Sequence, residues 1–169
     1  AGAVWVVHGG SQAFTITPNG GYRVADVQVD GGTVGAVTSY TFTNVTAPHT
    51  IRAAFAIDQF TITASSGANG SISPTGPLTL NYGASQTYTF TPSPGYHLDS
   101  LVVDGVNLAP AGSYTFTNVT ANHTIHVAFA IDQFTITASS GANGSITPSG
   151  LVGVSSGASQ TFTFTPAVG

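Results

Sequence analysis

The sequence predicts an all-β protein made of small tandem modules of about 74 residues, arranged as an end-to-end array. The first reason is a long internal repeat: Ser39 to Ile72 returns as Ser113 to Ile146, an offset of 113 − 39 = 74 residues. The second reason is the alternation of apolar residues with Thr, a period-two pattern typical of half-buried strands. The third is that Gly and Pro recur every few residues and leave no stretch with helical spacing. The two copies differ only at Pro48/Asn122, Arg52/His126 and Ala53/Val127.

The same period divides the chain into three modules of unequal completeness. We predict a first module over residues 1–57 that lacks its N-terminal strand or strands, a complete second module over 58–131, and a truncated third module over 132–169. An internal period overrides the usual expectation of one domain for a chain of this length. Both ends fall partway through a module. We therefore expect a window on a longer array, or a protomer that completes its end modules with neighbouring chains.

The first module opens with two predicted strands. β-branched residues around Trp5 indicate a strand at residues 3–7, which Gly9 and Gly10 end. Residues 13–17 alternate strictly, so that Phe14 and Ile16 face inward while Thr15 and Thr17 face outward.

Three further strands complete the first module. The turn at residues 18–21 leads into a strand at 22–29 with Val27 and Val29 inward, and Asp30-Gly31-Gly32 closes it as a hairpin. A strand around Tyr40 and Phe42 follows. The last runs over 49–56, with Ile51, Ala53 and Phe55 on one face.

The module junctions are very short. Ile57, Asp58 and Gln59 connect the first module to the second, and Ile131, Asp132 and Gln133 stand at the same phase before the third. Three residues make too short a linker for independent motion, so consecutive modules are expected to hold a fixed relation. The second module repeats the plan of the first, and its 78–82 segment has the phase of residues 4–8. This gives six or seven short strands per period.

Composition excludes several functions. Lys, Cys, Met and Glu are absent, and the net charge is −4. Binding to nucleic acid or to an anionic membrane surface needs clustered Lys and Arg, which the chain lacks. No apolar run approaches the roughly 20 residues that span a bilayer, so membrane insertion is not expected in this window. Without Cys or Lys, neither disulfides nor Lys–Asn crosslinks stabilise the modules.

No catalytic, cofactor-binding or metal-binding residues are predicted, and no cofactor is expected. Asp30 and Asp104 precede Gly in turns, where a hairpin role explains them better than calcium, which needs six to eight clustered oxygens. His49 and His123 recur in equivalent turns, each followed by Thr, and a hydrogen bond to a turn carbonyl is expected. His97-x-Asp99 has no counterpart in the other copy. No Ser–His–Asp set or carboxylate pair recurs, which argues against an enzyme.

A second class of function remains open for the repeated Thr-x-Thr pairs. Outward Thr ladders order water at an ice surface or hydrogen-bond a glycan in an adhesin, whereas the simpler interpretation is that Thr favours a solvated strand face. The candidate binding face comprises Thr61, Thr63, Thr89, Thr91, Thr115, Thr117, Thr135 and Thr137.

Several ordered segments together resemble a known family. FTITASSGANGSISP, GASQTYTFTPSPGYHLDSLVVDG and SYTFTNVTANHTIHVAFA are similar to the divergent internalin-type B-repeats of bacterial secreted and surface proteins. The resemblance covers essentially the whole chain, and it implies a compact β-sandwich-like or β-grasp-like module without catalytic residues. It also implies an extracellular or cell-surface spacer, stalk, filament or adhesive segment. The expected partners are copies of itself or neighbouring repeats, which gain strands by β-augmentation, or a glycan or another surface protein.

Overall fold

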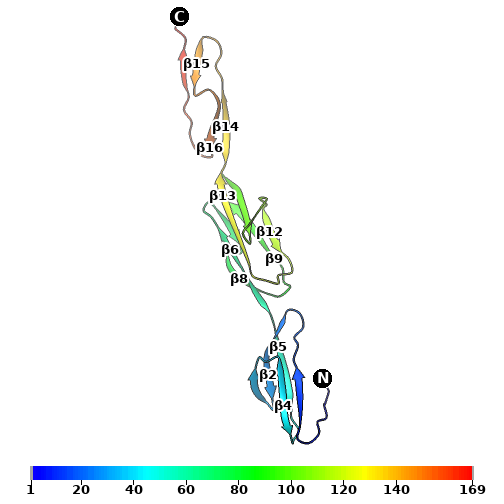
Figure 1. Ribbon diagram of the computed structural model, residues 1–169. Coiled ribbons are helices and arrows are strands. Elements are labelled where there is room, and N and C mark those ends of the chain that lie inside the picture. Colours follow the sequence, from blue (N-terminus) through cyan, green and yellow to red (C-terminus); the bar gives the residue numbers. More distant parts are fainter. Residues whose placement is uncertain (1, 169) are drawn as a thin grey trace. The chain divides into compact units, whose positions relative to one another are not determined.

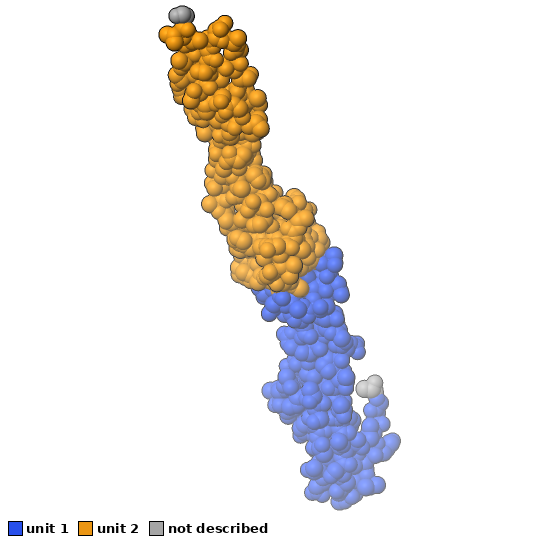
Figure 2. Space-filling model, turned by 45° about the horizontal axis from the view of Figure 1, so that its top comes forward, with its two compact units in different colours: residues 1–61, 79–85, 117–122 blue, residues 62–78, 86–116, 123–169 orange. Residues whose placement is uncertain are grey.

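The computed structural model describes residues 2–168 and contains 17 strands and no helix within them (Figure 1). Ala1 and Gly169, the two ends of the predicted partial modules, lie outside the described residues. The chain divides into two compact units, shown in different colours in Figure 2. The first comprises the described part of 1–61 with 79–85 and 117–122, and the second comprises 62–78, 86–116 and the described residues from 123 onward. The predicted all-β class is confirmed.

The first unit contains a three-stranded and a two-stranded antiparallel sheet. Their order is β3-β2-β5 and β1-β4. Ile16, Val24 and Val27 form the buried core, against which Val37 and Ile51 pack. The strands predicted around residues 13–17, 22–29, 40–42 and 49–56 are confirmed, and β3 is an addition. The strands are β1 Gly10–Thr15, β2 Tyr22–Val29, β3 Gly32–Gly35, β4 Ser39–Val45 and β5 Ile51–Ile57.

The strand predicted at residues 3–7 is wrong. No strand covers these residues, and the side chain of Trp5 is 96% exposed. In the second and third modules, the segments of the same phase are strands β8 and β16, and each pairs with the strand that opens its module. No such opening strand lies beside residues 3–7 within 2–168. Strand propensity alone therefore did not suffice, because a strand needs a neighbour for its backbone hydrogen bonds.

The second module is a β-sandwich of eight strands. A five-stranded sheet has the order β11-β10-β13-β6-β8, and a three-stranded sheet has the order β12-β9-β7. Contacts of β10 with β9 and of β13 with β7 join the sheets. Only β11, a short hairpin strand, exceeds the six or seven strands predicted. The strands are β6 Gln59–Ser66, β7 Gly70–Ser73, β8 Gly76–Asn81, β9 Gln86–Pro92, β10 Tyr96–Val103, β11 Val106–Leu108, β12 Ser113–Phe116 and β13 His123–Ile131.

The core of this sandwich is filled from both sheets. Ile62, Leu101 and Ile125 point inward from the larger sheet, and Tyr88 and Phe116 from the smaller. The rings of Tyr88 and Phe116 meet edge to face at 6.0 Å. A module without disulfides depends on this apolar burial for its stability.

Tyr88 supplies a stability prediction. Its side chain is 0% exposed, its hydroxyl has no hydrogen-bond partner, and burial raises the pKa of its phenol. The other two modules carry Phe14 and Phe162 at this phase. Because an unpaired buried polar group costs about 1–3 kcal/mol, Tyr88→Phe is expected to stabilise the second module by about 1 kcal/mol. Urea unfolding measures the change. A loss of stability would mean that the hydroxyl has a partner.

The third module contains four strands in two antiparallel pairs. β14 pairs with β16 and β15 with β17. Within the described residues no strands correspond to β10–β13. Several of its apolar side chains are consequently more exposed than their second-module counterparts. The strands are β14 Gln133–Ala138, β15 Gly144–Thr147, β16 Gly150–Ser155 and β17 Thr163–Pro166.

The backbone conformation repeats together with the sequence. Asp30 and Asp104 both have φ of 50°, and Asn44 and Asn118 have φ of 49° and 51°. Asp and Asn tolerate this left-handed region better than other residues that carry a Cβ. The Asp-Gly hairpins predicted from the sequence are confirmed between β2 and β3 and between β10 and β11.

Candidate functional site

The predicted junction residues connect strands with almost no intervening chain. Asp58 is the single residue between β5 and β6, and Asp132 is the single residue between β13 and β14. The Asp58 amide donates to the Gly21 carbonyl at 2.8 Å, and the Asp58 carbonyl accepts from the Tyr82 amide at 2.8 Å. Asp58 thus joins the turn before β2 to the end of β8 through its own backbone.

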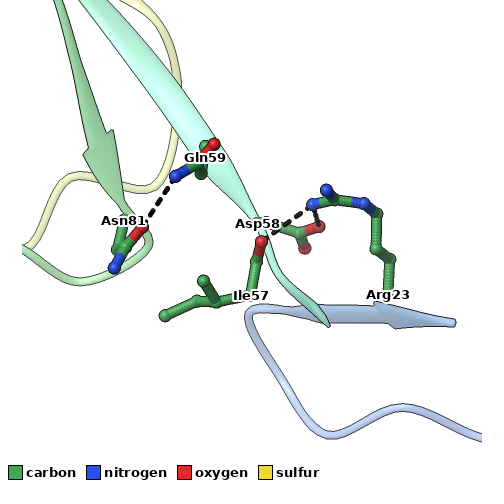
Figure 3. Close-up of polar contacts among 5 residues, drawn as sticks. All are labelled: Arg23, Ile57, Asp58, Gln59 and Asn81. Atoms are coloured by element: carbon green, nitrogen blue, oxygen red, sulfur yellow. Dashed lines mark hydrogen bonds and ion pairs between the residues drawn. The ribbon is translucent and has the colours of Figure 1, made fainter. Parts of the chain in front are cut away.

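Side chains reinforce the first junction (Figure 3). The Arg23 guanidinium donates to the Ile57 carbonyl at 2.8 Å and pairs with the Asp58 carboxylate at 3.3 Å. On the other side, the Gln59 amide donates to the Asn81 side-chain oxygen at 3.0 Å. The Arg23 side chain is 58% exposed and the Asp58 side chain 34% exposed, so solvent screens this ion pair and it contributes at most about 1 kcal/mol.

The second junction repeats the same arrangement with different side chains. The Asp132 amide donates to the Gly95 carbonyl, and the Ser156 amide donates to the Asp132 carbonyl, both at 2.8 Å. His97 Nδ1 lies 2.8 Å from the Asp132 carboxylate, and Gln133 donates to the Ser155 hydroxyl at 2.8 Å. The two junctions therefore share the same backbone hydrogen bonds, whereas the side chains that contact the junction residues differ between them.

Sequence reasoning missed the partners of the junction aspartates. The spacing of His97 and Asp99 occurs in one copy only and predicts no partner for His97, whereas in the structure His97 lies beside Asp132. The sequence does contain one indication of these partners. Arg23 and His97 are one period apart, as are Asp58 and Asp132, so each junction aspartate has a basic residue at the same distance before it in the sequence.

A glycine allows the first junction to close. The ring of Tyr82 packs on Gly21, where an added Cβ would lie 2.3 Å from the nearest ring carbon. Gly21 also has φ of 78°, in the left-handed region. At the second junction Gly95 has φ of 80°, but it faces only the small side chain of Ser156. Both backbones favour glycine. An added Cβ would meet the bulky Tyr82 ring at Gly21, but at Gly95 it would meet the Ser156 hydroxyl at 2.6 Å, which can rotate away.

The equivalent histidines form a second recurring cluster. His49 Nδ1 lies 2.7 Å from the Asp30 carboxylate, and His123 Nδ1 lies 2.7 Å from that of Asp104. The His49 ring also packs on Phe42, with centroids 5.0 Å apart. The expected partner, a turn carbonyl, is thus corrected: the histidine contacts the carboxylate of the hairpin aspartate. In the first module that carboxylate also accepts from the Thr50 amide at 2.7 Å.

The Asp–His clusters lower the pKa of both carboxyls. At Asp30, the hydrogen bond with His49 and that from the Thr50 amide lower the pKa. At Asp104, burial raises the pKa, but the Thr124 amide and His123 together lower it further, so that the net shift is downward.

The lowered pKa values predict acid sensitivity. A carboxyl whose pKa is lower in the folded state stabilises the fold above its unfolded pKa of about 3.9, and this contribution is lost as the pH falls through the folded value. The free energy of unfolding of Asp104→Asn should therefore fall less than that of the wild type as the pH drops below about 4. Urea unfolding of the wild type and Asp104→Asn at several acidic pH values measures this. Parallel pH profiles for the two proteins would contradict the account.

The candidate Thr residues lie on different sheets. Thr61 and Thr63 are on β6 of the five-stranded sheet, and Thr135 and Thr137 are on β14. Thr61 is half-buried, and its amide donates to the Asn122 side chain at 2.8 Å. The others belong to or follow the three-stranded sheet: Thr89 and Thr91 on β9, Thr115 on β12, and Thr117 just after β12.

The three-stranded sheet brings hydroxyls together on its exposed face. Thr89 on the central strand pairs with Ser113 on one side and Ser73 on the other. Thr87 pairs with Thr115, and their hydroxyls lie 2.8 Å apart. The face has no charged residue among these positions. It can donate and accept hydrogen bonds but provides no acid, base or nucleophile set.

The part of the chain that the structure describes lacks two features that other functions would need. No group of three or more His, Cys, Asp or Glu side chains stands close enough to hold a metal ion there. No helix there has the length and apolar character needed to cross a membrane.

One protein family matches the chain. The divergent InlB B-repeat domain matches residues 2–59 and again 60–133, so the boundary between its two copies falls beside Asp58. Neither curated proteins nor solved structures give a significant match. Repeats of this family are associated with bacterial surface proteins and are typically non-enzymatic. Since the two tandem matches cover most of the 169 residues, the chain belongs to the divergent InlB B-repeat family.

Proposed function

We propose that the chain is a non-catalytic structural segment of an extracellular or cell-surface bacterial protein, in which successive modules form a rod, stalk or filament. The observation that carries this proposal is the repeated junction. At Asp58 and at Asp132, one residue connects two strands and makes the same two backbone hydrogen bonds. A repeat that transmits its register through backbone bonds keeps the orientation of its neighbour, as a spacer requires.

The composition supports the same role. Each module depends on apolar burial and on its neighbours rather than on disulfides, and a module of this size has a core worth only about 3–5 kcal/mol alone. The hydrogen bonds at the junctions add to that core. The scarcity of Lys and Arg also leaves few sites for trypsin-like proteases. As part of this function, we propose that end modules gain strands from neighbouring chains.

A distance measurement tests the proposed rigidity. Ser39 and Ser113 are exposed, have the same phase in successive modules, and can be replaced by Cys in a chain without native Cys. Spin labels on the Ser39→Cys/Ser113→Cys variant are expected to give one narrow distance distribution in pulsed electron resonance. The matched control inserts a Gly-Ser linker after Asp58, which should broaden the distribution. If the distribution without the linker is equally broad, the modules move independently and the rod proposal is wrong.

The hydroxyl face of the three-stranded sheet favours a second candidate, an adhesive or ice-binding surface. Rows of exposed Ser and Thr with regular strand spacing offer hydrogen bonds to a glycan or to ordered water. Thr89 lies in the middle of this face, so Thr89→Lys should abolish binding on a glycan array or thermal hysteresis. Thr63→Lys, on the other sheet, is the control. Equal signals from both variants and the wild type would exclude this face as the site.

A further inference from the structure

Two exposed hairpins of the chain are built on the dipeptide Asp-Gly. Asp30-Gly31 connects β2 to β3, and Asp104-Gly105 connects β10 to β11. All four residues are exposed. Asp-Gly is a chemically labile sequence, because glycine has no side chain that keeps its backbone nitrogen away from the carboxyl carbon of the aspartate. An unprotected Asp-Gly turn therefore isomerises slowly in water.

This isomerisation needs only water as a reactant. The glycine nitrogen bonds to aspartate Cγ, the bond from Cγ to the hydroxyl of the protonated carboxyl breaks, and that hydroxyl leaves as water with the amide proton. A second water then opens the cyclic succinimide. When it attacks the former backbone carbonyl, the main chain runs through the side-chain carbon as isoaspartate. The extra carbon does not fit a two-residue hairpin whose residues both have positive φ.

The strand after the second hairpin holds both oxygens of the aspartate. One carboxylate oxygen of Asp104 lies 2.7 Å from His123 Nδ1, and the other accepts from the Thr124 amide at 2.7 Å. The Asp104 amide donates to the Thr124 carbonyl at 3.1 Å. The ring of His123 is itself supported by Phe116, with centroids 4.9 Å apart. We call the pair of residues that holds the carboxylate the His–Thr clamp.

The first module repeats the clamp with the same geometry. Asp30 has one carboxylate oxygen 2.7 Å from His49 Nδ1, and the other accepts from the Thr50 amide at 2.7 Å. Phe42 stacks on the His49 ring, with centroids 5.0 Å apart. Each Asp-Gly hairpin of the chain thus has its own His–Thr clamp.

We propose that the His–Thr clamps protect two sites of backbone isomerisation, Asp104 and Asp30, by holding each carboxylate on the neighbouring strand. A carboxylate with both oxygens in contact with that strand cannot turn its carbon freely toward the glycine nitrogen. The clamp residues are positioning residues, because they act through the aspartate. This inference goes beyond the proposed structural function and does not depend on it.

The charge state of the carboxyls acts in the same direction. The hydrogen bond with His49 and that from the next amide lower the pKa of Asp30. At Asp104 burial raises the pKa, but the Thr124 amide and His123 outweigh it, so that the net shift is downward. A lower pKa leaves less of the protonated carboxyl, which is the form that loses its hydroxyl as water.

Ageing of the full chain at mildly acidic pH and body temperature tests the proposal. Chromatography with electron-transfer fragmentation of proteolytic peptides separates isoaspartate from aspartate at each site. In His123→Ala, isoaspartate at position 104 should form at least about tenfold faster than in the wild type, as for the loss of one hydrogen bond to a charged group. Position 30 of the same chain is the internal control and should not change. In the matched variant His49→Ala, the faster site should be position 30.

Three further measurements separate the clamp from a general loss of structure. Circular dichroism checks that each variant is folded. His123→Asn, whose side-chain amide can donate to the carboxylate as Nδ1 does, should return position 104 to nearly the wild-type rate. In urea, where no clamp forms, both positions should isomerise rapidly and at similar rates. Equal rates at position 104 in folded wild type and His123→Ala, a rise at both positions in His123→Ala, or slow isomerisation in urea would each overturn the proposal.

Discussion

Replacing Gly21 by alanine is expected to destabilise the first junction by about 2–5 kcal/mol, from about 1–2 kcal/mol of left-handed strain and about 1–3 kcal/mol of overpacking. The backbone at Gly21 has φ of 78°, and the new Cβ would lie 2.3 Å from the Tyr82 ring. The ring must move, and the hydrogen bonds of Asp58 with the Gly21 carbonyl and the Tyr82 amide weaken with it. Urea unfolding measures the loss.

The neighbouring glycine is a matched control for this substitution. At Gly20 an added Cβ has no heavy atom within 4 Å, and φ lies outside the left-handed region. Gly20→Ala should therefore change stability by less than about 0.5 kcal/mol. Gly95→Ala at the second junction should fall between the two, since its backbone is also left-handed but it faces only Ser156. Equal effects at Gly20 and Gly21 would show that the junction packing contributes nothing.

Truncating Ile62 to alanine is expected to cost about 2–5 kcal/mol, the usual range for a fully buried aliphatic side chain. Ile62 is 0% exposed in a central strand of the sandwich. Ile136 has the same sequence neighbours but is 40% exposed, so Ile136→Ala should cost less than about 1 kcal/mol in the dilute monomer. Urea unfolding of both variants measures the two costs.

The comparison isolates packing from local sequence. Both isoleucines lie in the segment Phe-Thr-Ile-Thr-Ala, so strand propensity cannot produce a difference between them. Equal costs in dilute solution would contradict the assignment of a complete second and an incomplete third module.

The strand pattern was largely predictable from the sequence because alternation and turn residues act locally. Phe14 and Ile16 face inward as their period indicates, and Asp30-Gly31 forms the hairpin that its left-handed preference favours. The family resemblance is confirmed by the tandem matches. Strand β5 ends at Ile57 and strand β13 ends at Ile131. The predicted module boundaries and the role of the junction residues in holding modules together stay predictions.

Long-range partners were less predictable because periodicity says nothing about which strands meet. The β-branched residues around Trp5 predict a strand at residues 3–7, but a strand also needs a partner, and no partner strand lies beside these residues in the described chain. The repeated Thr-x-Thr pairs likewise predict one candidate face, but Thr63 and Thr89 belong to different sheets. The bond between His97 and Asp132 joins residues 35 positions apart, and only the shared phase of Arg23 and His97 hinted at it.

Hydrogen exchange at the junction amides tests the central claim most directly. The amides of Asp58 and Tyr82 at the first junction, and of Asp132 and Ser156 at the second, are all hydrogen-bond donors. If these bonds hold successive modules together, the four amides should exchange as slowly as amides inside the neighbouring strands. Exchange at the rate of an open turn would show that the junctions are flexible linkers and contradict the account.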